Sequence, residues 1–127
     1  MAGTGALKTI REKTAICRTY RFEAAHFLPN VHREHKCRRM HGHNYRVDIW
    51  VAGPVEATGF VMDFFDLDEV VSPLVRNLDH RVLNEVLGLE NPTAELIAAW
   101  FFERLKCAGI TAVRVYETDD CFAEVWT

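Results

Sequence analysis

The sequence predicts an α+β domain in which two helices cover one face of a four-stranded antiparallel sheet. Three observations carry this prediction. Two segments with apolar residues at every second position come first, two helical patterns with capping residues follow, and two shorter alternating segments come last. Strands and helices grouped in this way are typical of α+β folds. The length of 127 residues suits a single domain, 1–127, with about residues 1–12 as a frayed N-terminus.

The first two strands are expected from Thr14 to Leu28 and from about His41 to Val51. In each, apolar side chains alternate with polar ones, so one face of the sheet is expected to be buried and the other to meet solvent. Pro29 ends the first strand, because proline has no N–H to donate to a neighbouring strand. A polar loop, VHREHKCRRM at 31–40, joins the two strands.

The first helix is expected to begin after Asp63, whose carboxylate can accept a hydrogen bond at the N-cap. Pro73 lies inside the apolar pattern of this helix and removes the donor that would bond to Glu69, so a kink or break is expected there. The apolar stripe consists of Leu67, Val70, Val71, Leu74 and Leu78.

The second helix has clearer boundaries. Asn91 can serve as its N-cap, Pro92 suits its first position, and Gly109 suits its C-terminal end. The face expected to be buried consists of Leu96, Ile97, Trp100, Phe101 and Leu105.

The last two strands are expected at Thr111–Thr118 and Cys121–Trp126, with a turn at Asp119 and Asp120. A sheet of four strands has two open edges, and proteins usually cover or pair such edges. Oligomerisation through the edge strands is therefore expected.

Composition excludes several classes of function. The formal net charge of −3 and a pI near 6.0 argue against a general nucleic-acid binder, which should be basic. No apolar run approaches the roughly 20 residues that a membrane span requires, and the first residues contain no apolar signal core. A cytoplasmic protein without a membrane partner is expected, and its cysteines, none of them in a CxxC pair, are expected to be thiols.

Three histidines form a candidate zinc site. His41 and His43 are two residues apart in a strand, so both imidazoles project from the same face. His26 ends the preceding strand and can face them if the two strands pair antiparallel. Three imidazole ligands leave a fourth position for water or substrate, which is typical of catalytic zinc. An isolated HxH pair is more often a turn without metal, but the third histidine and the nearby Cys37 favour metal binding here.

Cys37 lies in the loop among basic residues, and a metal ion and positive charges both favour a thiolate. A thiolate can be a fourth zinc ligand, a nucleophile or a general base, and the residues alone leave these roles open. A closed site of one cysteine and three histidines would make the metal structural and the protein a binding module. His32 and His35 are expected to be solvated. The basic loop is either a solvated surface or a collector of an anionic substrate such as a phosphate ester.

Two further features are candidates for function. Asp79 and His80 follow the first helix, and a carboxylate beside an imidazole is either a proton-transfer pair or a helix-end cap with a solvated histidine. Glu117 shares the parity of Val113 and Val115, so a carboxylate is expected on a buried face, where it needs a partner. A ligand with an amidine-like edge, such as a pterin or guanine, would supply that partner.

The sequence resembles the 6-pyruvoyltetrahydropterin synthase superfamily, and most closely its 6-carboxytetrahydropterin synthase branch. The short spacing of CRRMHGH is similar to that branch, whereas the animal pyruvoyl synthases have a longer insertion there. The joint pattern is specific and spans the chain from about Tyr20 onward. The matching segments are FEAAHFLP at 22–29, HKCRRMHGHNY at 35–45, VMDFFDL at 61–67, LDHRVLN at 78–84, LENPTAE at 89–95 and YET at 116–118.

The functional residues of the family can be transferred position by position. The resemblance implies zinc ligation by His26, His41 and His43, with Cys37 as the catalytic base and Asp79 and His80 as a partner proton relay. It implies pterin anchoring by Glu117, and a pterin pocket lined from an adjoining subunit by Thr93 and Glu95.

The resemblance also implies the tunnelling fold, with barrel-like trimers stacked into hexamers and the pterin at subunit boundaries. The implied reaction converts 7,8-dihydroneopterin triphosphate to 6-carboxy-5,6,7,8-tetrahydropterin, releasing acetaldehyde and triphosphate, in queuosine (7-deazaguanine) biosynthesis. The alternatives are a 6-pyruvoyltetrahydropterin synthase, a non-catalytic zinc-binding module and, more distantly, a guanine-nucleotide hydrolase of the same fold.

Overall fold

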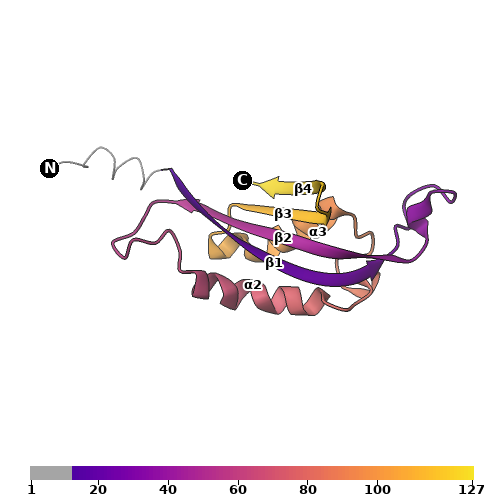
Figure 1. Ribbon diagram of the computed structural model, residues 1–127, viewed down its shortest axis with the longest axis horizontal. Coiled ribbons are helices and arrows are strands. Elements are labelled where there is room, and N and C mark those ends of the chain that lie inside the picture. The colour runs from indigo at the N-terminus through magenta and orange to yellow at the C-terminus, as the bar shows by residue number, and fades with distance from the viewer. Residues whose placement is uncertain (1–12) are drawn as a thin grey trace.

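The computed structural model describes residues 13–127, so the N-terminal segment expected to be frayed, about 1–12, lies outside the described residues (Figure 1). The strands and helices follow the expected order. The strands are β1 (Thr14–His26), β2 (His41–Gly53), β3 (Ala112–Thr118) and β4 (Cys121–Trp126), the helices are α2 (Phe64–Leu78) and α3 (Ala94–Leu105), and the short 3₁₀ turns are η1 (Lys36–Arg38), η2 (Leu83–Glu85) and η3 (Lys106–Ala108).

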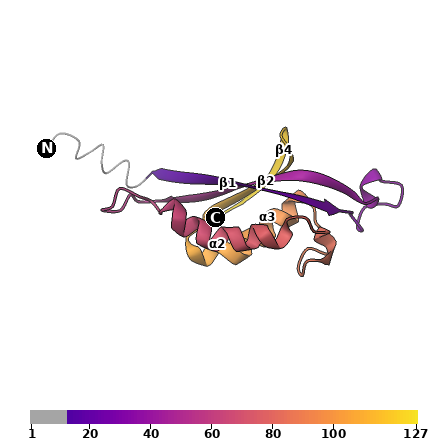
Figure 2. The ribbon, with the colours of Figure 1, turned by 60° about the horizontal axis from the view of Figure 1, so that its bottom comes forward.

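The four strands form one antiparallel sheet in the order β1-β2-β3-β4. Both helices lie against the same face of this sheet (Figure 2). The predicted α+β fold with two helices on one face of a four-stranded sheet is therefore confirmed. None of the helices within residues 13–127 is long and apolar enough to cross a membrane.

The core lies between the sheet and the two helices. Strand residues such as Val47, Ile49 and Val113 are fully buried against Leu67 of α2 and Phe101 of α3. Burying a side chain of this size contributes about 1.5–3 kcal/mol each, which is why the alternating pattern fixes the register of the strands.

The face of the sheet opposite the helices carries polar side chains that hydrogen-bond to one another. Asp48 is only 2% exposed there, because it accepts hydrogen bonds from Thr19 (2.7 Å) and from two guanidinium nitrogens of Arg46 (3.0 and 2.9 Å). A buried carboxylate of this kind is tolerated only with such partners.

Helix α2 departs from its prediction at two positions. Asp63 caps it as expected, accepting a hydrogen bond from the Phe65 N–H. The helix continues without a break across Pro73, because Leu67, Val71 and Leu78 on either side are buried against the sheet. Val70, predicted in the apolar stripe, is 37% exposed.

Helix α3 begins later than predicted. Thr93, and not Asn91, is its N-cap, accepting a hydrogen bond from the Leu96 N–H (3.2 Å). Leu96 was expected on the buried face but is 46% exposed, while the other four members of that face are buried. Gly109 follows η3 with φ of 94°, a left-handed conformation that suits glycine, and ends the helical segment as predicted.

Candidate functional site

The paired ends of β1 and β2 bring three histidines together. His26 lies opposite His41 in the strand register, and Ala24 lies opposite His43. All three side chains project toward the face covered by the helices. One ring nitrogen from each lies within 4.8 Å of the other two. Zinc bound at about 2.1 Å by tetrahedral nitrogens separates them by roughly 3.4 Å, so this cluster has the size that a metal ion requires.

Backbone carbonyls orient two of the three rings. His26 Nδ1 lies 2.8 Å from the Pro92 carbonyl oxygen, and His41 Nδ1 lies 2.7 Å from the Arg39 carbonyl oxygen. A carbonyl only accepts hydrogen bonds, so both Nδ1 atoms carry the hydrogen and both Nε2 atoms present a lone pair. Metal-binding histidines commonly have this arrangement, with the far nitrogen bonded to a carbonyl or carboxylate.

Burial keeps the histidines in their ligand form. His26 is fully buried, and this burial lowers its pKa to about 4, with the neighbouring His41 and His43 lowering it further and the Pro92 carbonyl opposing the shift. Burial also lowers the pKa of His43, against an opposing effect of Glu117. Both imidazoles are therefore neutral at pH 7, as metal binding requires.

The lone pairs of the cluster fit a bound cation. His26 Nε2 and His41 Nε2 lie 3.0 Å apart, and neither can donate to the other when both hydrogens sit on Nδ1. His43 Nε2 is buried and forms no well-aligned hydrogen bond within residues 13–127, although a Glu117 carboxylate oxygen lies 2.9 Å from it. A metal ion between the three nitrogens would satisfy all of them, so these histidines can form a metal site.

Glu117 lies beside this cluster, near the C-terminal end of β3. One of its carboxylate oxygens is 2.9 Å from His43 Nε2 and 3.7 Å from His26 Nε2. The strand register of β3 and β4 shifts between Tyr116 and Thr118, which places Glu117 at an irregularity. Its side chain is 29% exposed, so the carboxylate is less buried than its parity predicted.

A small cavity links Glu117 to the start of α3. It measures about 140 Å³, and Glu95 and Glu117 both line it. Thr93 lies just before it as the helix cap, and its hydroxyl can still donate a hydrogen bond while its oxygen accepts one from Leu96. Ligand pockets usually exceed about 300 Å³, so this cavity is smaller than a typical small-molecule site.

Cys37 lies on η1, in the loop that runs from His26 to His41. Its side chain is half-buried. Among the described residues, the cluster that could hold a metal contains the three histidines without Cys37. The structure therefore places Cys37 on the loop that connects His26 to His41, outside the set of residues that could hold a metal.

Asp79 and His80 form a close pair after α2. An Asp79 carboxylate oxygen lies 3.0 Å from His80 Nδ1, and the other side of the ring, Nε2, is 3.6 Å from Glu23. Asp79 also accepts a hydrogen bond from the Glu23 N–H (2.9 Å). This bond, together with the hydrogen bond between Asp79 and His80, keeps the pKa of Asp79 below its ordinary value. The hydrogen bond and charge of Asp79 in turn raise the pKa of His80.

The backbone at His80 is unusual. Its φ of 57° is the one positive value at a non-glycine residue within 13–127. Its N–H donates to the Glu23 carbonyl (2.6 Å), which fastens this turn to the edge of β1. Strained conformations of this kind persist where the surroundings enforce them and cluster at functional sites.

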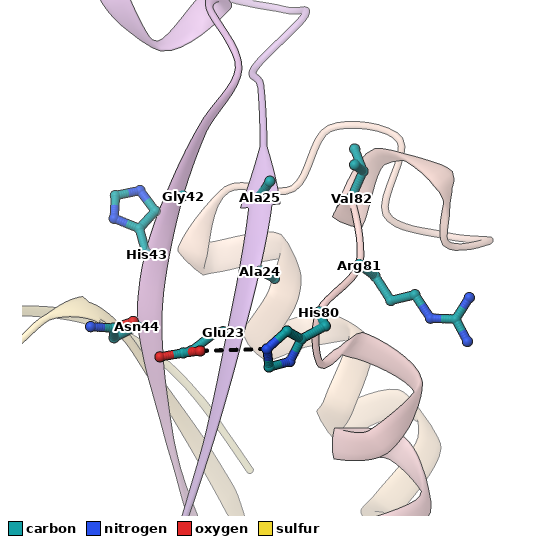
Figure 3. A pocket seen from close by; sticks show the side chains of 9 residues that line it. All are labelled: Glu23, Ala24, Ala25, Gly42, His43, Asn44, His80, Arg81 and Val82. Atoms are coloured by element: carbon teal, nitrogen blue, oxygen red, sulfur yellow. Dashed lines mark ion pairs between the residues drawn. The ribbon is translucent and has the colours of Figure 1, made fainter.

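His80 lies on the other side of the β1–β2 strand pair from His43 of the histidine cluster. Glu23, His80 and Arg81 line a cavity of about 560 Å³ whose wall also includes Gly42, His43 and Asn44 of β2. Figure 3 shows His43 beyond β2 and His80 beyond β1, with both strands between them. The structure thus joins the three histidines and Glu117, while His80 lies across the β1–β2 strand pair from His43 and lines the same cavity.

Sequence reasoning missed Glu23 and the two carbonyls that orient His26 and His41. Glu23 stands in the FEAAH segment next to residues of the buried face, and its polar parity could have marked it as a partner for a group at the sheet edge. The Pro92 and Arg39 carbonyls carry no side-chain signal, because any residue has one.

Comparisons with known proteins agree on one family. Residues 15–127 match the family model for 6-pyruvoyl tetrahydropterin synthase. A 6-carboxy-5,6,7,8-tetrahydropterin synthase from Synechocystis sp. is 49% identical over 112 residues, covering 81% of this chain and 85% of the relative. A relative from Archaeoglobus fulgidus is 42% identical, covering 82% of this chain and 88% of its own. The solved structure of Caenorhabditis elegans 6-pyruvoyl tetrahydropterin synthase superimposes with a TM-score of 0.83 at 27% identity, covering 92% of this chain and 98% of that one.

Proposed function

The chain belongs to the 6-pyruvoyl tetrahydropterin synthase family, and from this premise we propose that it is a zinc-dependent 6-carboxy-5,6,7,8-tetrahydropterin synthase. Such an enzyme is a lyase that converts 7,8-dihydroneopterin triphosphate and one water to 6-carboxy-5,6,7,8-tetrahydropterin in queuosine biosynthesis, with release of acetaldehyde and triphosphate. The sequence identity to the Synechocystis synthase, 49% over most of both chains, carries this assignment.

The metal in this proposal is zinc, held by His26, His41 and His43. The convergence of three imidazoles supports it, with two of the three fixed by carbonyls behind them. Zinc with three protein ligands supplies a Lewis acid that makes hydroxyl and adjacent C–H protons of a bound substrate more acidic.

The remaining roles belong to side chains of the chain itself. Cys37 would accept and return a proton on one side of the substrate side chain, and His80 would do so on the other. Asp79 holds the hydrogen on His80 Nδ1, which leaves Nε2 for the substrate. Glu117 would accept two hydrogen bonds from the amidine edge of the pterin, and Thr93 and Glu95 would line the same pocket.

The proposed assembly is a homo-oligomer built from trimers, with a hexamer as the expected form and each site shared between neighbouring subunits. Two features support sharing. The cavity beside Glu117 is too small for a whole pterin site, and His80 lies across the β1–β2 strand pair from His43 of its own chain. A neighbouring copy can supply what one chain lacks.

Product analysis tests the reaction. Zinc-loaded protein incubated with 7,8-dihydroneopterin triphosphate should yield acetaldehyde and 6-carboxytetrahydropterin, identified by mass spectrometry. The alternative within the family, a 6-pyruvoyltetrahydropterin synthase, would yield triphosphate and the pyruvoyl product without acetaldehyde. Turnover without acetaldehyde would therefore assign the chain to that alternative.

The Cys37→Ala variant tests whether the metal serves catalysis. It should retain zinc and lose turnover, because Cys37 lies outside the ligand set. A non-catalytic zinc module with Cys37 as fourth ligand predicts loss of zinc instead. Cys107→Ala is the matched control, since the Cys107 thiol is exposed on η3, directly after the C-terminal end of α3.

A further inference from the structure

The turn that carries Cys37 is fixed through both backbone groups of that residue. The Cys37 carbonyl accepts a hydrogen bond from the Leu28 N–H (2.7 Å), two residues beyond His26. The Cys37 N–H donates to Nδ1 of His35 (3.0 Å). The first bond ties the thiol residue to the end of β1, and the second ties it to a side chain of its own loop.

His35 caps the turn with a ring nitrogen instead of the usual hydroxyl or carboxylate. Its own carbonyl accepts from the Arg38 N–H (3.1 Å), which closes the 3₁₀ turn around Cys37. Because Nδ1 accepts a hydrogen bond from a backbone N–H, it carries no hydrogen, and the ring hydrogen sits on Nε2. The Cys37 N–H is therefore held by His35 in the tautomer whose ring hydrogen sits on Nε2.

His35 is less exposed than the residues on either side of it. Within the turn, His35 and Cys37 are half-buried, whereas Lys36 and Arg38 are exposed. The sequence had suggested a solvated His35. A further guanidinium contact stiffens the same loop, since Arg38 donates to the Pro29 and Val31 carbonyls (3.1 and 3.0 Å).

We propose that His35 is a positioning residue for Cys37, holding the thiol at the place from which it exchanges a proton with the substrate. The proposal rests on the proposed function, because it takes Cys37 as the proton-transferring base. His35 acts through the Cys37 backbone and does not itself exchange the proton. Misplacement of a catalytic group by about 1 Å can lower the rate on the order of 100-fold, so a single anchoring hydrogen bond can matter for turnover.

Three variants test this role. His35→Ala removes the acceptor, and His35→Asn replaces it with an amide oxygen, which is a favourable N-cap acceptor. His32→Ala is the matched control, because the His32 ring contacts that of His35 at 5.6 Å between centroids while its side chain does not bond to Cys37. The readouts are the hydrogen-exchange rate of the Cys37 amide, kcat, KM and zinc content.

In His35→Ala, the Cys37 amide should exchange at least about tenfold faster and kcat should fall about tenfold, with KM and zinc content unchanged. His35→Asn should restore both the protection and most of kcat, and His32→Ala should resemble the wild type. A wild-type kcat in His35→Ala overturns the proposal, and so does an Asn variant that recovers amide protection without recovering kcat.

Failure of the proposed function would be recognised separately. A wild-type protein that forms no acetaldehyde and turns over no pterin contradicts the proposed function whatever the His35 variants do. Unchanged exchange of the Cys37 amide in His35→Ala contradicts the positioning role even when the wild type is fully active.

Discussion

At the scale of single residues, the position of each ring hydrogen decides what the histidines can bind. Hydrogens on Nδ1 of His26 and His41 leave two Nε2 lone pairs 3.0 Å apart, an arrangement that a cation stabilises and that repels without one. The buried Nε2 of His43, which has a Glu117 carboxylate oxygen 2.9 Å away, completes the set. A metal ion would therefore be held by the three nitrogens together.

Removing one ligand should release the metal. We expect one zinc per chain in the wild type and an affinity lowered more than about 100-fold in His41→Ala, since even residues behind a ligand are worth 10–100-fold. Metal analysis after competition with a chelator measures this. His32→Ala should keep the wild-type affinity, and equal zinc retention by both variants would rule out the triad as the site.

Asp79 should control the protonation of His80. Its hydrogen bond and charge raise the pKa of His80 above the ordinary 6.5, with Glu23 adding a smaller effect in the same direction. Asp79→Asn should therefore lower the pKa of His80 toward its ordinary value, so that the ring loses its proton at a lower pH. Glu23→Gln should lower it by less. NMR titration of the His80 ring measures both, and an unchanged pKa in Asp79→Asn would contradict the pairing.

Glu117 should act on the pterin and not as a metal ligand. Replacing its carboxylate in Glu117→Gln removes a charge-assisted hydrogen bond worth about 1.5–3 kcal/mol, so KM should rise on the order of 10–100-fold while zinc content stays constant. Steady-state kinetics with parallel metal analysis separates the two effects. Glu103→Gln, on the exposed side of α3, is the control. Zinc loss in Glu117→Gln would instead make this residue a ligand.

At the scale of elements, the N-terminus of α3 combines a structural and a proposed binding role. Thr93→Ala should lower the free energy of unfolding by about 1 kcal/mol, because the Leu96 N–H loses its acceptor. Thr93→Ser should keep the cap and the stability. Denaturant unfolding at matched protein concentration measures this. If Thr93→Ala were as stable as Thr93→Ser, the hydroxyl would not be a cap.

The alternating patterns of the strands predicted the structure more accurately than the capping residues predicted the helix ends. The parity of His26, His41 and His43 fixed their common face, because an antiparallel register that buries Val47 and Ile49 admits no other side. The start of α3 was misplaced by two residues, since asparagine and threonine are both good caps and tertiary contacts choose between them.

The placement of Asp79 and His80 could not be predicted from local pattern. It depends on a left-handed φ at His80 and on hydrogen bonds to Glu23, a residue 56 positions from Asp79 in sequence. The anchoring of Cys37 by His35 was missed for a different reason, because loop geometry has no periodicity from which to infer a contact.

At the scale of the whole molecule, a single chain leaves two features incomplete: the edges of its sheet and the set of proposed catalytic groups. The sheet ends in β1 and β4, whose outer edges can pair with other strands, although the turn at His80–Val82 already bonds to the end of β1. The proposed catalytic groups are also divided, with Cys37 on the loop between His26 and His41 and His80 across the strand pair from His43. An oligomer can complete both, by pairing edges and by bringing His80 of one chain to the Cys37 of another.

Mixing two inactive variants tests this division. If Cys37 and His80 of one site come from different chains, co-assembly of Cys37→Ala with His80→Ala in equal amounts should restore about a quarter of wild-type activity, since each site draws independently on two chains. Co-assembly of Cys37→Ala with His41→Ala should restore none, because the loop that carries Cys37 ends at His41 and both belong to one chain. Acetaldehyde release after mixing and reassembly measures the recovery. Recovery in neither mixture, with mixed oligomers demonstrated by native mass spectrometry, would place Cys37 and His80 of each site in a single chain.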